Sequence, residues 1–147
     1  MRIAVGSDHA GFEDPPPHYK PSIIAHLREQ GHEVIDCGTD GPESVDYPDF
    51  ADRVAEAVLS GKADRGILLC GTGIGIAIAA NRHKGIRAAT VATEEMVRLS
   101  REHNDANVLA MGRRVLPLEK VLEFIDIWLE TPFSEGERHK RRVAKMG

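Results

Sequence analysis

Apolar and polar residues alternate along the chain in a pattern that predicts a repeated strand–helix unit. Short apolar runs bounded by turn residues are typical of strands, and they occur at residues 2–6, 33–37, 66–70, 86–91 and 108–111. Apolar residues at helical spacing predict helices over residues 21–30, 49–60, 94–102 (capped by Thr93) and 118–129, with another that follows the glycines after residue 70 and runs to about Asn81. These crossovers are long enough to join parallel strands.

The fold class follows from this alternation. Residues 66–70 are apolar on both faces, as in a central strand of a parallel sheet that helices cover on both sides. The sequence therefore predicts an α/β fold, a doubly wound, Rossmann-like three-layer sandwich with a five-stranded parallel sheet. Residues 134–146 predict a charged helical tail, and no linker or repeat interrupts residues 1–147, so we expect a single domain. With strand order 2-1-3-4-5, the ligand site of such a fold lies between strands one and three.

One segment interrupts the regular pattern. Residues 13–20 contain three successive prolines, which cannot donate hydrogen bonds to a helix or a sheet. We predict a surface loop there, with Pro21 at the first position of the next helix.

The strongest candidate chemistry lies where the third strand ends. Cys70 stands at this point, and the turn that follows is Gly71, Thr72, Gly73, Ile74 and Gly75. Backbone N–H groups at a helix N-terminus converge on an anion, and such a nest favours the thiolate form of a neighbouring cysteine. The turn lacks the third glycine of a dinucleotide fingerprint and the Lys-Ser/Thr pair of a P-loop. A glycine turn needed only for its backbone shape, beside a cysteine that is merely buried, remains the open alternative.

Other polar residues follow the strands and helices at informative places. Asp8 and His9 come directly after the first strand, so the predicted topology brings them to the Cys70 turn. His103 and Asn104 form a polar break after a helix. Capture of a small anion such as phosphate fits a group of arginines in this acidic chain, namely Arg113, Arg114, Arg138, Arg141 and Arg142. Helix capping by Asp8, a helix-dipole contact of His103 and a solvated arginine face are the structural alternatives.

Composition excludes several classes of function. The net charge of −4 and the 5% of aromatic residues argue against nucleic-acid binding. No apolar run reaches the ~18 residues of a membrane span, and residue 2 enters a strand without a signal-peptide pattern. Two cysteines, Cys37 and Cys70, make no disulfide framework, so we expect a cytoplasmic protein.

Five motifs in order together resemble the ribose-5-phosphate isomerase type B family, which includes galactose-6-phosphate isomerase subunits. They are Ser7-Asp8-His9-Ala10-Gly11-Phe12, Asp46-Tyr47-Pro48, the Cys70–Gly75 turn with Ala79-Ala80-Asn81, the run from Ser100 to Asn107, and Gly136-Glu137-Arg138-His139. The resemblance implies a carbohydrate-metabolism enzyme of the pentose phosphate pathway that interconverts ribose 5-phosphate and ribulose 5-phosphate through an enediolate, with no metal and no cofactor.

The resemblance also implies roles for single residues. Cys70 matches the general base and Thr72 a group that moves protons, while His103, with Asp8 as its partner, matches the residue that opens the sugar ring. Contacts with the substrate fall to the N–H groups of Gly71, Gly73, Ile74 and Gly75, to the side chains of Tyr47 and Asn104, and, for the phosphate, to His9, Arg114, Arg138 and Arg142. Arg138 and Arg142 would come from the neighbouring subunit of a homodimer, with a tetramer left open.

Residues 13–20 depart from the family pattern as an insertion of a few residues beside His9. Two alternatives therefore stay open: an isomerase for another sugar phosphate, of galactose, allose or erythrose type, and a non-catalytic flavodoxin-like module that binds phosphate or nucleotide.

Overall fold

The computed structural model describes residues 1–147 and shows a parallel five-stranded sheet in the order β2-β1-β3-β5-β4. The strands are β1 (Arg2–Ser7), β2 (Glu33–Asp36), β3 (Arg65–Cys70), β4 (Ala88–Thr90) and β5 (Val108–Gly112). The helices are the short 3-10 helix η1 (His9–Phe12), α1 (Tyr19–Glu29), α2 (Tyr47–Leu59), α3 (Ile74–Ala80), α4 (Glu94–Glu102), α5 (Leu118–Glu130) and α6 (Glu137–Met146).

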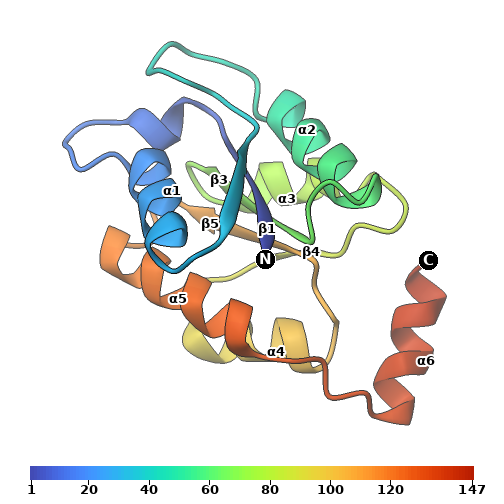
Figure 1. The fold of residues 1–147 in the computed structure, drawn as a ribbon. Helices are drawn as coiled ribbons and strands as arrows, with labels where there is room; N and C mark the ends of the chain where they lie inside the picture. Colours follow the sequence, from blue (N-terminus) through green and yellow to red (C-terminus); the bar gives the residue numbers. More distant parts are fainter.

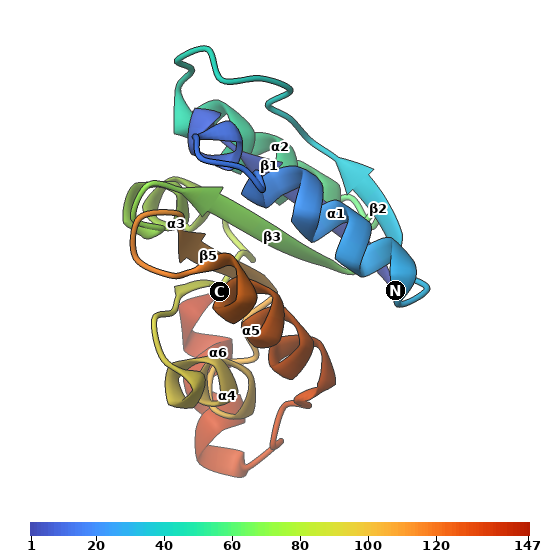
Figure 2. The ribbon, with the colours of Figure 1, turned by 90° about the vertical axis from the view of Figure 1, so that its left-hand side faces the viewer.

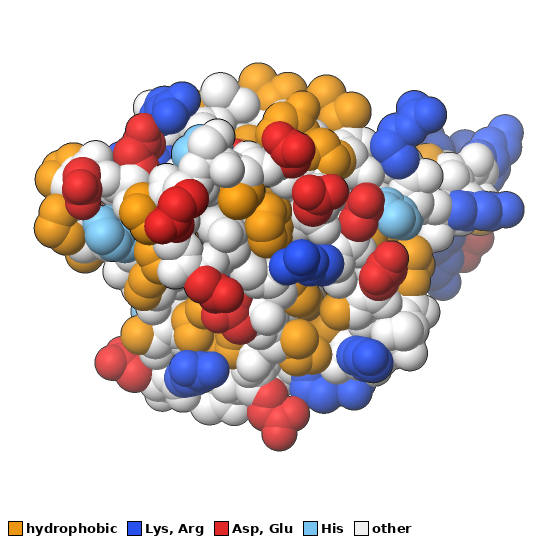
Figure 3. Space-filling view, turned by 90° about the horizontal axis from the view of Figure 1, so that it is seen from above, with side chains coloured by type: hydrophobic (Ala, Val, Ile, Leu, Met, Phe, Trp, Pro, Cys, Tyr) orange, Lys and Arg blue, Asp and Glu red, His pale blue; other side chains and the backbone are white.

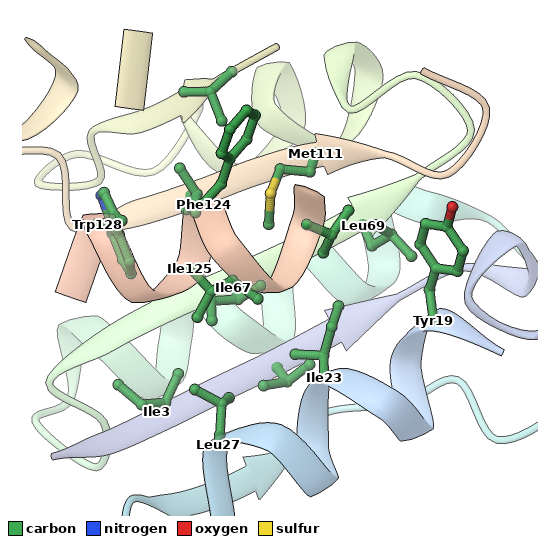
Figure 4. Close-up of a cluster of buried hydrophobic side chains, with 14 of the residues drawn as sticks. Ile3, Tyr19, Ile23, Leu27, Ile67, Leu69, Met111, Phe124, Ile125 and Trp128 are labelled. Carbon is green, nitrogen blue, oxygen red and sulfur yellow. The ribbon is translucent and has the colours of Figure 1, made fainter. Parts of the chain in front are cut away.

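Helices cover both faces of the sheet, which confirms the predicted doubly wound α/β sandwich (Figures 1 and 2). On one face, side chains of α1, α4 and α5 pack on the strands, and Figure 4 shows Ile67 and Leu69 of β3 among those of α1 and α5. On the other face, α2 and α3 pack on a second cluster that contains Leu68 and Cys70. Burial of these two clusters supplies the main driving force for folding.

The strand order 2-1-3-4-5 is wrong in its last two strands, because β5 lies beside β3 and β4 lies at the edge. All of β5 is buried, whereas β4 has three half-buried residues and is shorter than the predicted 86–91. A strand that is apolar on both faces belongs in the interior of a sheet, and a short one suits an edge. The exchange places the loop after β5 directly against the turn after β3.

Two helices begin earlier than predicted. α1 begins at Tyr19, so Pro21 is its third residue, and α2 begins at Tyr47 with Pro48 as its second. Both prolines occupy a first turn, where the backbone N–H has no partner in the helix. Tyr19 and Lys20 are buried, so the exposed loop predicted over residues 13–20 ends at His18.

The tail forms the predicted helix, although α6 begins at Glu137, and it lies beside the end of α4, outside the three layers (Figures 1 and 2). The Ser134 N–H and hydroxyl donate to the carbonyl of Glu102 at 3.2 and 2.7 Å. In Figure 3, Lys and Arg side chains gather on the side where α6 lies in Figure 1. None of the helices has the length and apolar character that crossing a bilayer requires.

Candidate active site

A cleft of about 390 Å³ opens at the carboxyl ends of β1 and β3, where the strand order reverses. Four separate segments line it: the loop after β1, the start of α2, the turn after β3 and the loop after β5. Its lining residues are Asp8, Tyr47, Cys70, Gly71, Thr72, Ile74, Gly75 and Arg114. The sequence-based expectation that the Asp8 and Cys70 loops meet at the switch point is thus confirmed.

The glycine turn is shaped by its contact with β5. Gly73 has a φ of +80°, and a Cβ at this position would lie 2.8 Å from the carbonyl carbon of Met111. Only glycine adopts this conformation and this close approach without strain. The loop after β5 is bonded to the same turn, since the N–H groups of Arg113 and Arg114 donate to the carbonyls of Cys70 and Gly71, both at 2.9 Å.

The turn presents several backbone donors to the cleft. The Gly73 N–H donates to Sγ of Cys70 at 3.2 Å, and the Ile74 N–H donates to the Thr72 hydroxyl at 3.2 Å. The N–H groups of Gly71, Thr72 and Gly75 have no acceptor within the chain. Unpaired N–H groups at a helix N-terminus are suited to hold an anion.

Cys70 belongs both to the core and to the cleft. Its side chain is 5% exposed and packs in the cluster beneath α2 and α3, yet it lines the cleft wall as the last residue of β3. Cys70 is thus a packing residue that also lines the cleft, and its role as a reactive thiol stays a prediction.

Backbone contacts fix the side chains after β1. Asp8 caps η1 by accepting a hydrogen bond from the Ala10 N–H at 2.9 Å, and it is 6% exposed. His9 accepts a hydrogen bond from the Val45 N–H at Nδ1, 3.2 Å away, so a neutral His9 ring carries its proton on Nε2. The cap that sequence offered as an alternative role for Asp8 is present, alongside its place in the cleft.

Two side chains form the rim of the cleft. The Tyr47 ring lies over Gly75, where an added Cβ would be 2.7 Å from the Tyr47 Cζ. The Arg114 guanidinium lies over Gly71, with Nη1 3.2 Å from the Cβ position there. Arg114 donates from Nε and Nη2 to Oε1 of Glu13, at 3.3 and 2.9 Å. This hydrogen bond raises the pKa of Arg114 and lowers the pKa of Glu13.

Sequence reasoning missed Glu13 as a residue of the site. The available signal was its position, because it is the first residue of the proline-containing segment 13–20, which we predict to be an insertion beside the Asp8-His9 loop. Its partner Arg114 is 101 positions away in sequence, so only the fold reveals the pair.

The remaining predicted site residues lie elsewhere in the chain. His103 caps the C-terminus of α4, and its ring stacks on His139 of α6 at 4.3 Å between centroids with an angle of 10° between planes. Asn104 lines a different cavity of about 360 Å³, together with Met146 of α6. Burial lowers the pKa of His139, and the charges of His103, Arg138 and Arg142 add to this effect.

The sheet register shows why these two groups are separate. His103 and Asn104 come shortly before β5, at the end of the sheet where Val108 pairs with Gly66. Cys70 lies at the opposite end of the sheet, where it pairs with Gly112. Five residues of strand span about 15 Å. One chain therefore does not bring His103 to Asp8, and the expected partnership of these two residues is not formed within it.

The fold and the cleft define a doubly wound α/β protein with a glycine turn, unpaired backbone N–H groups and a thiol at its switch point. The sequence profile of the ribose/galactose isomerase family matches residues 3–146, and the chain belongs to that family. Ribose-5-phosphate isomerase B of Escherichia coli is 51% identical over 142 residues, which are 97% of this chain and 91% of that protein.

Solved structures agree with this membership. Ribose-5-phosphate isomerase B of Clostridium thermocellum matches with a TM-score of 0.94 at 54% identity, covering 100% of this chain and 95% of that chain. The ribose 5-phosphate isomerase of Thermotoga maritima matches with a TM-score of 0.92 at 48% identity, covering 99% of this chain and 96% of that chain.

Proposed function

We propose that this protein is an isomerase that interconverts ribose 5-phosphate and ribulose 5-phosphate through an enediolate. The observation that carries the proposal is the meeting of the Cys70 thiol and three unpaired N–H groups in one cleft. Such an arrangement suits removal of a proton next to a carbonyl, since that reaction needs a base and a preorganised site for negative oxygen. The choice of ribose 5-phosphate as the substrate comes from the names of the relatives.

In the proposed mechanism, the Cys70 thiolate removes the proton from the carbon next to the carbonyl of the open-chain aldose. The electrons of the broken C–H bond form the enediolate, whose oxygens accept hydrogen bonds from the N–H groups of Gly71, Thr72 and Gly75. The Thr72 hydroxyl moves a proton between the two oxygens, and the Cys70 thiol returns its proton to the neighbouring carbon. A placed base contributes about 10²–10⁴-fold and an oxyanion donor about 10²–10³-fold.

Phosphate binding and ring opening require a second set of residues. His9 and Arg114 stand at or beside the cleft, whereas His103, Asn104, Arg138 and Arg142 belong to the part of the chain around α6. We infer that a second copy of the chain brings these four residues to the cleft as one group, because His103 is tied to α6 through the His103–His139 stack. His103 of one subunit would then meet Asp8 of the other.

An assay over a panel of phosphorylated aldoses tests the reaction and the sugar. We expect the fastest turnover with ribose 5-phosphate and loss of turnover in Cys70→Ala, with the fold retained and cooperative melting. Cys70→Ser serves as the matched control, because its hydroxyl is similar in size to the thiol but is a much weaker acid. A preference for a six- or four-carbon sugar would overturn the substrate, and full activity in Cys70→Ala would remove Cys70 as the base. Tight nucleotide binding without turnover would favour the non-catalytic module.

Mixing of two inactive variants tests the shared site. Cys70→Ala and the double variant Arg138→Ala/Arg142→Ala are each expected to be inactive, but co-expressed in equal amounts they should recover about a quarter of the wild-type activity. Half of the dimers are then mixed, and one of their two sites has every residue. No recovery in dimers shown to be mixed would mean that the tail serves its own chain.

A further inference from the structure

The carboxylate of Glu13 is bound to Arg114, the arginine to which the proposed function assigns the substrate phosphate. Its Oε1 accepts hydrogen bonds from both Nε and Nη2 of Arg114, at 3.3 and 2.9 Å, on the rim of the cleft. A phosphate group uses the same paired donors of a guanidinium. The Glu13 side chain is 33% exposed and the Arg114 side chain 61%, so water and ions reach the pair.

The inserted segment holds Glu13 in this place. The Glu13 N–H donates to the carbonyl of Ala10 at 3.3 Å and ends η1. The prolines at 15–17 follow, and a hydrogen bond of 2.9 Å between the side chains of Asp14 and His18 spans the segment just before α1 begins. The carboxylate that faces Arg114 therefore stands on an anchored part of the backbone.

We propose that Glu13 is a specificity-determining residue that competes with the substrate phosphate for Arg114. The proposal rests on the proposed function, in which Arg114 binds phosphate. An exposed ion pair is weak, so a dianionic phosphate monoester displaces Glu13 or tolerates its charge, whereas a ligand with a single negative charge competes on equal terms. Glu13 thus weakens binding of all anions and leaves the site selective for dianions.

Calorimetric titration of the full-length protein with inorganic phosphate tests this competition without any need for turnover. Glu13→Gln keeps the shape and removes the charge, and we expect it to tighten phosphate binding by about tenfold and to lower the KM for ribose 5-phosphate by a similar factor. Asp14→Asn is the matched control, since it removes a charge from the same segment at a side chain that pairs with His18 and not with Arg114. It should leave phosphate binding unchanged within about twofold.

A second background shows whether Glu13 acts through Arg114. With Arg114→Gln in place, Glu13→Gln should no longer tighten phosphate binding, because the contested donors are gone. The proposal is overturned if Glu13→Gln leaves phosphate binding unchanged or weakens it, if Asp14→Asn has the same effect, or if the gain persists without Arg114. Absence of isomerase turnover in the wild type would overturn the proposed function instead and would leave the phosphate titration interpretable.

Discussion

The Gly73 N–H donates a hydrogen bond to Sγ of Cys70, with 3.2 Å between nitrogen and sulfur. The thiol and the glycine turn are therefore a single structural unit, in which the last side chain of β3 is held by the turn that follows it. The same turn passes so close to β5 that a side chain at Gly73 would meet the Met111 backbone. Substitutions that disturb the turn should therefore also change the position of the Cys70 thiol.

Replacement of Gly73 by alanine tests this unit. We expect Gly73→Ala to cost about 1–2 kcal/mol for the positive φ, a further amount for the contact with Met111, and at least about tenfold in kcat as the donors move. Gly61→Ala is the control, because Gly61 has a φ of +81° but no atom within 4 Å of its Cβ position. Urea denaturation and isomerase kinetics on both variants provide the measurement. Equal losses in the two would show that the approach to β5 is unimportant.

The ring of Tyr47 over Gly75 gives a prediction about substrate binding. A Cβ at Gly75 meets only the end of a side chain that is 40% exposed, so Gly75→Ala should push the ring aside at little cost in stability. The KM for ribose 5-phosphate should rise by about tenfold, the size of one lost hydrogen bond. In a Tyr47→Ala background, Gly75→Ala should change KM no further. An additional rise there would mean that the new methyl group itself obstructs the sugar.

The ion pair between Lys20 and Asp36 predicts that removing one partner costs more stability than removing the other. Lys20 is 2% exposed and pairs with Asp36, which is 40% exposed, and with Asp40. Asp36→Asn leaves a buried cation with one distant partner and should cost about 3 kcal/mol, whereas Lys20→Met leaves solvated carboxylates and should cost less than about 1 kcal/mol. Adding Lys20→Met to Asp36→Asn should therefore restore stability in urea denaturation. A double variant as unstable as Asp36→Asn would place the cost in the hydrogen bond from the Gly38 N–H, whose acceptor loses its negative charge.

Most of the fold was predictable, because apolar runs and helical spacing report burial directly. The cap of α4 illustrates this, since Thr93 accepts the predicted kind of hydrogen bond, from the Met96 N–H at 3.2 Å. The order of β4 and β5 was not predictable from spacing alone, because it depends on which strand buries more surface. The starts of α1 and α2 were misplaced because proline tolerates any position in a first turn.

The candidate site was likewise predictable in part. Local sequence identified the Cys70 turn and the Asp8 loop, and the switch-point rule placed them together. The Glu13–Arg114 pair and the stack of His103 on His139 depend on contacts between segments distant in sequence or outside the three layers, so no local pattern announces them. The roles that the family resemblance implies for these residues remain predictions.

The stack of His103 on His139 predicts that α6 is held less firmly at acid pH. Burial, followed by the charges of His103, Arg138 and Arg142, places the pKa of His139 below its ordinary value of 6.5. The docked state thus favours the neutral ring, while an undocked or unfolded tail takes up a proton at the ordinary pKa. The free energy that docks α6 is therefore fully present above that value and falls as the pH drops through 6.5 and below.

Backbone amide signals of residues 137–146, followed by NMR between about pH 7.5 and pH 5.5, should show α6 loosening at the lower pH. His139→Phe keeps a flat ring for the stack but cannot titrate, so its tail should respond less to pH over the same range. Since His139 is the only buried residue of α6, its ring is the main contact through which protonation acts on the helix. An identical pH response in the wild type and in His139→Phe would assign the effect to another group. If the loosened tail no longer reaches a second subunit, activity that depends on Arg138 and Arg142 should decline over the same range.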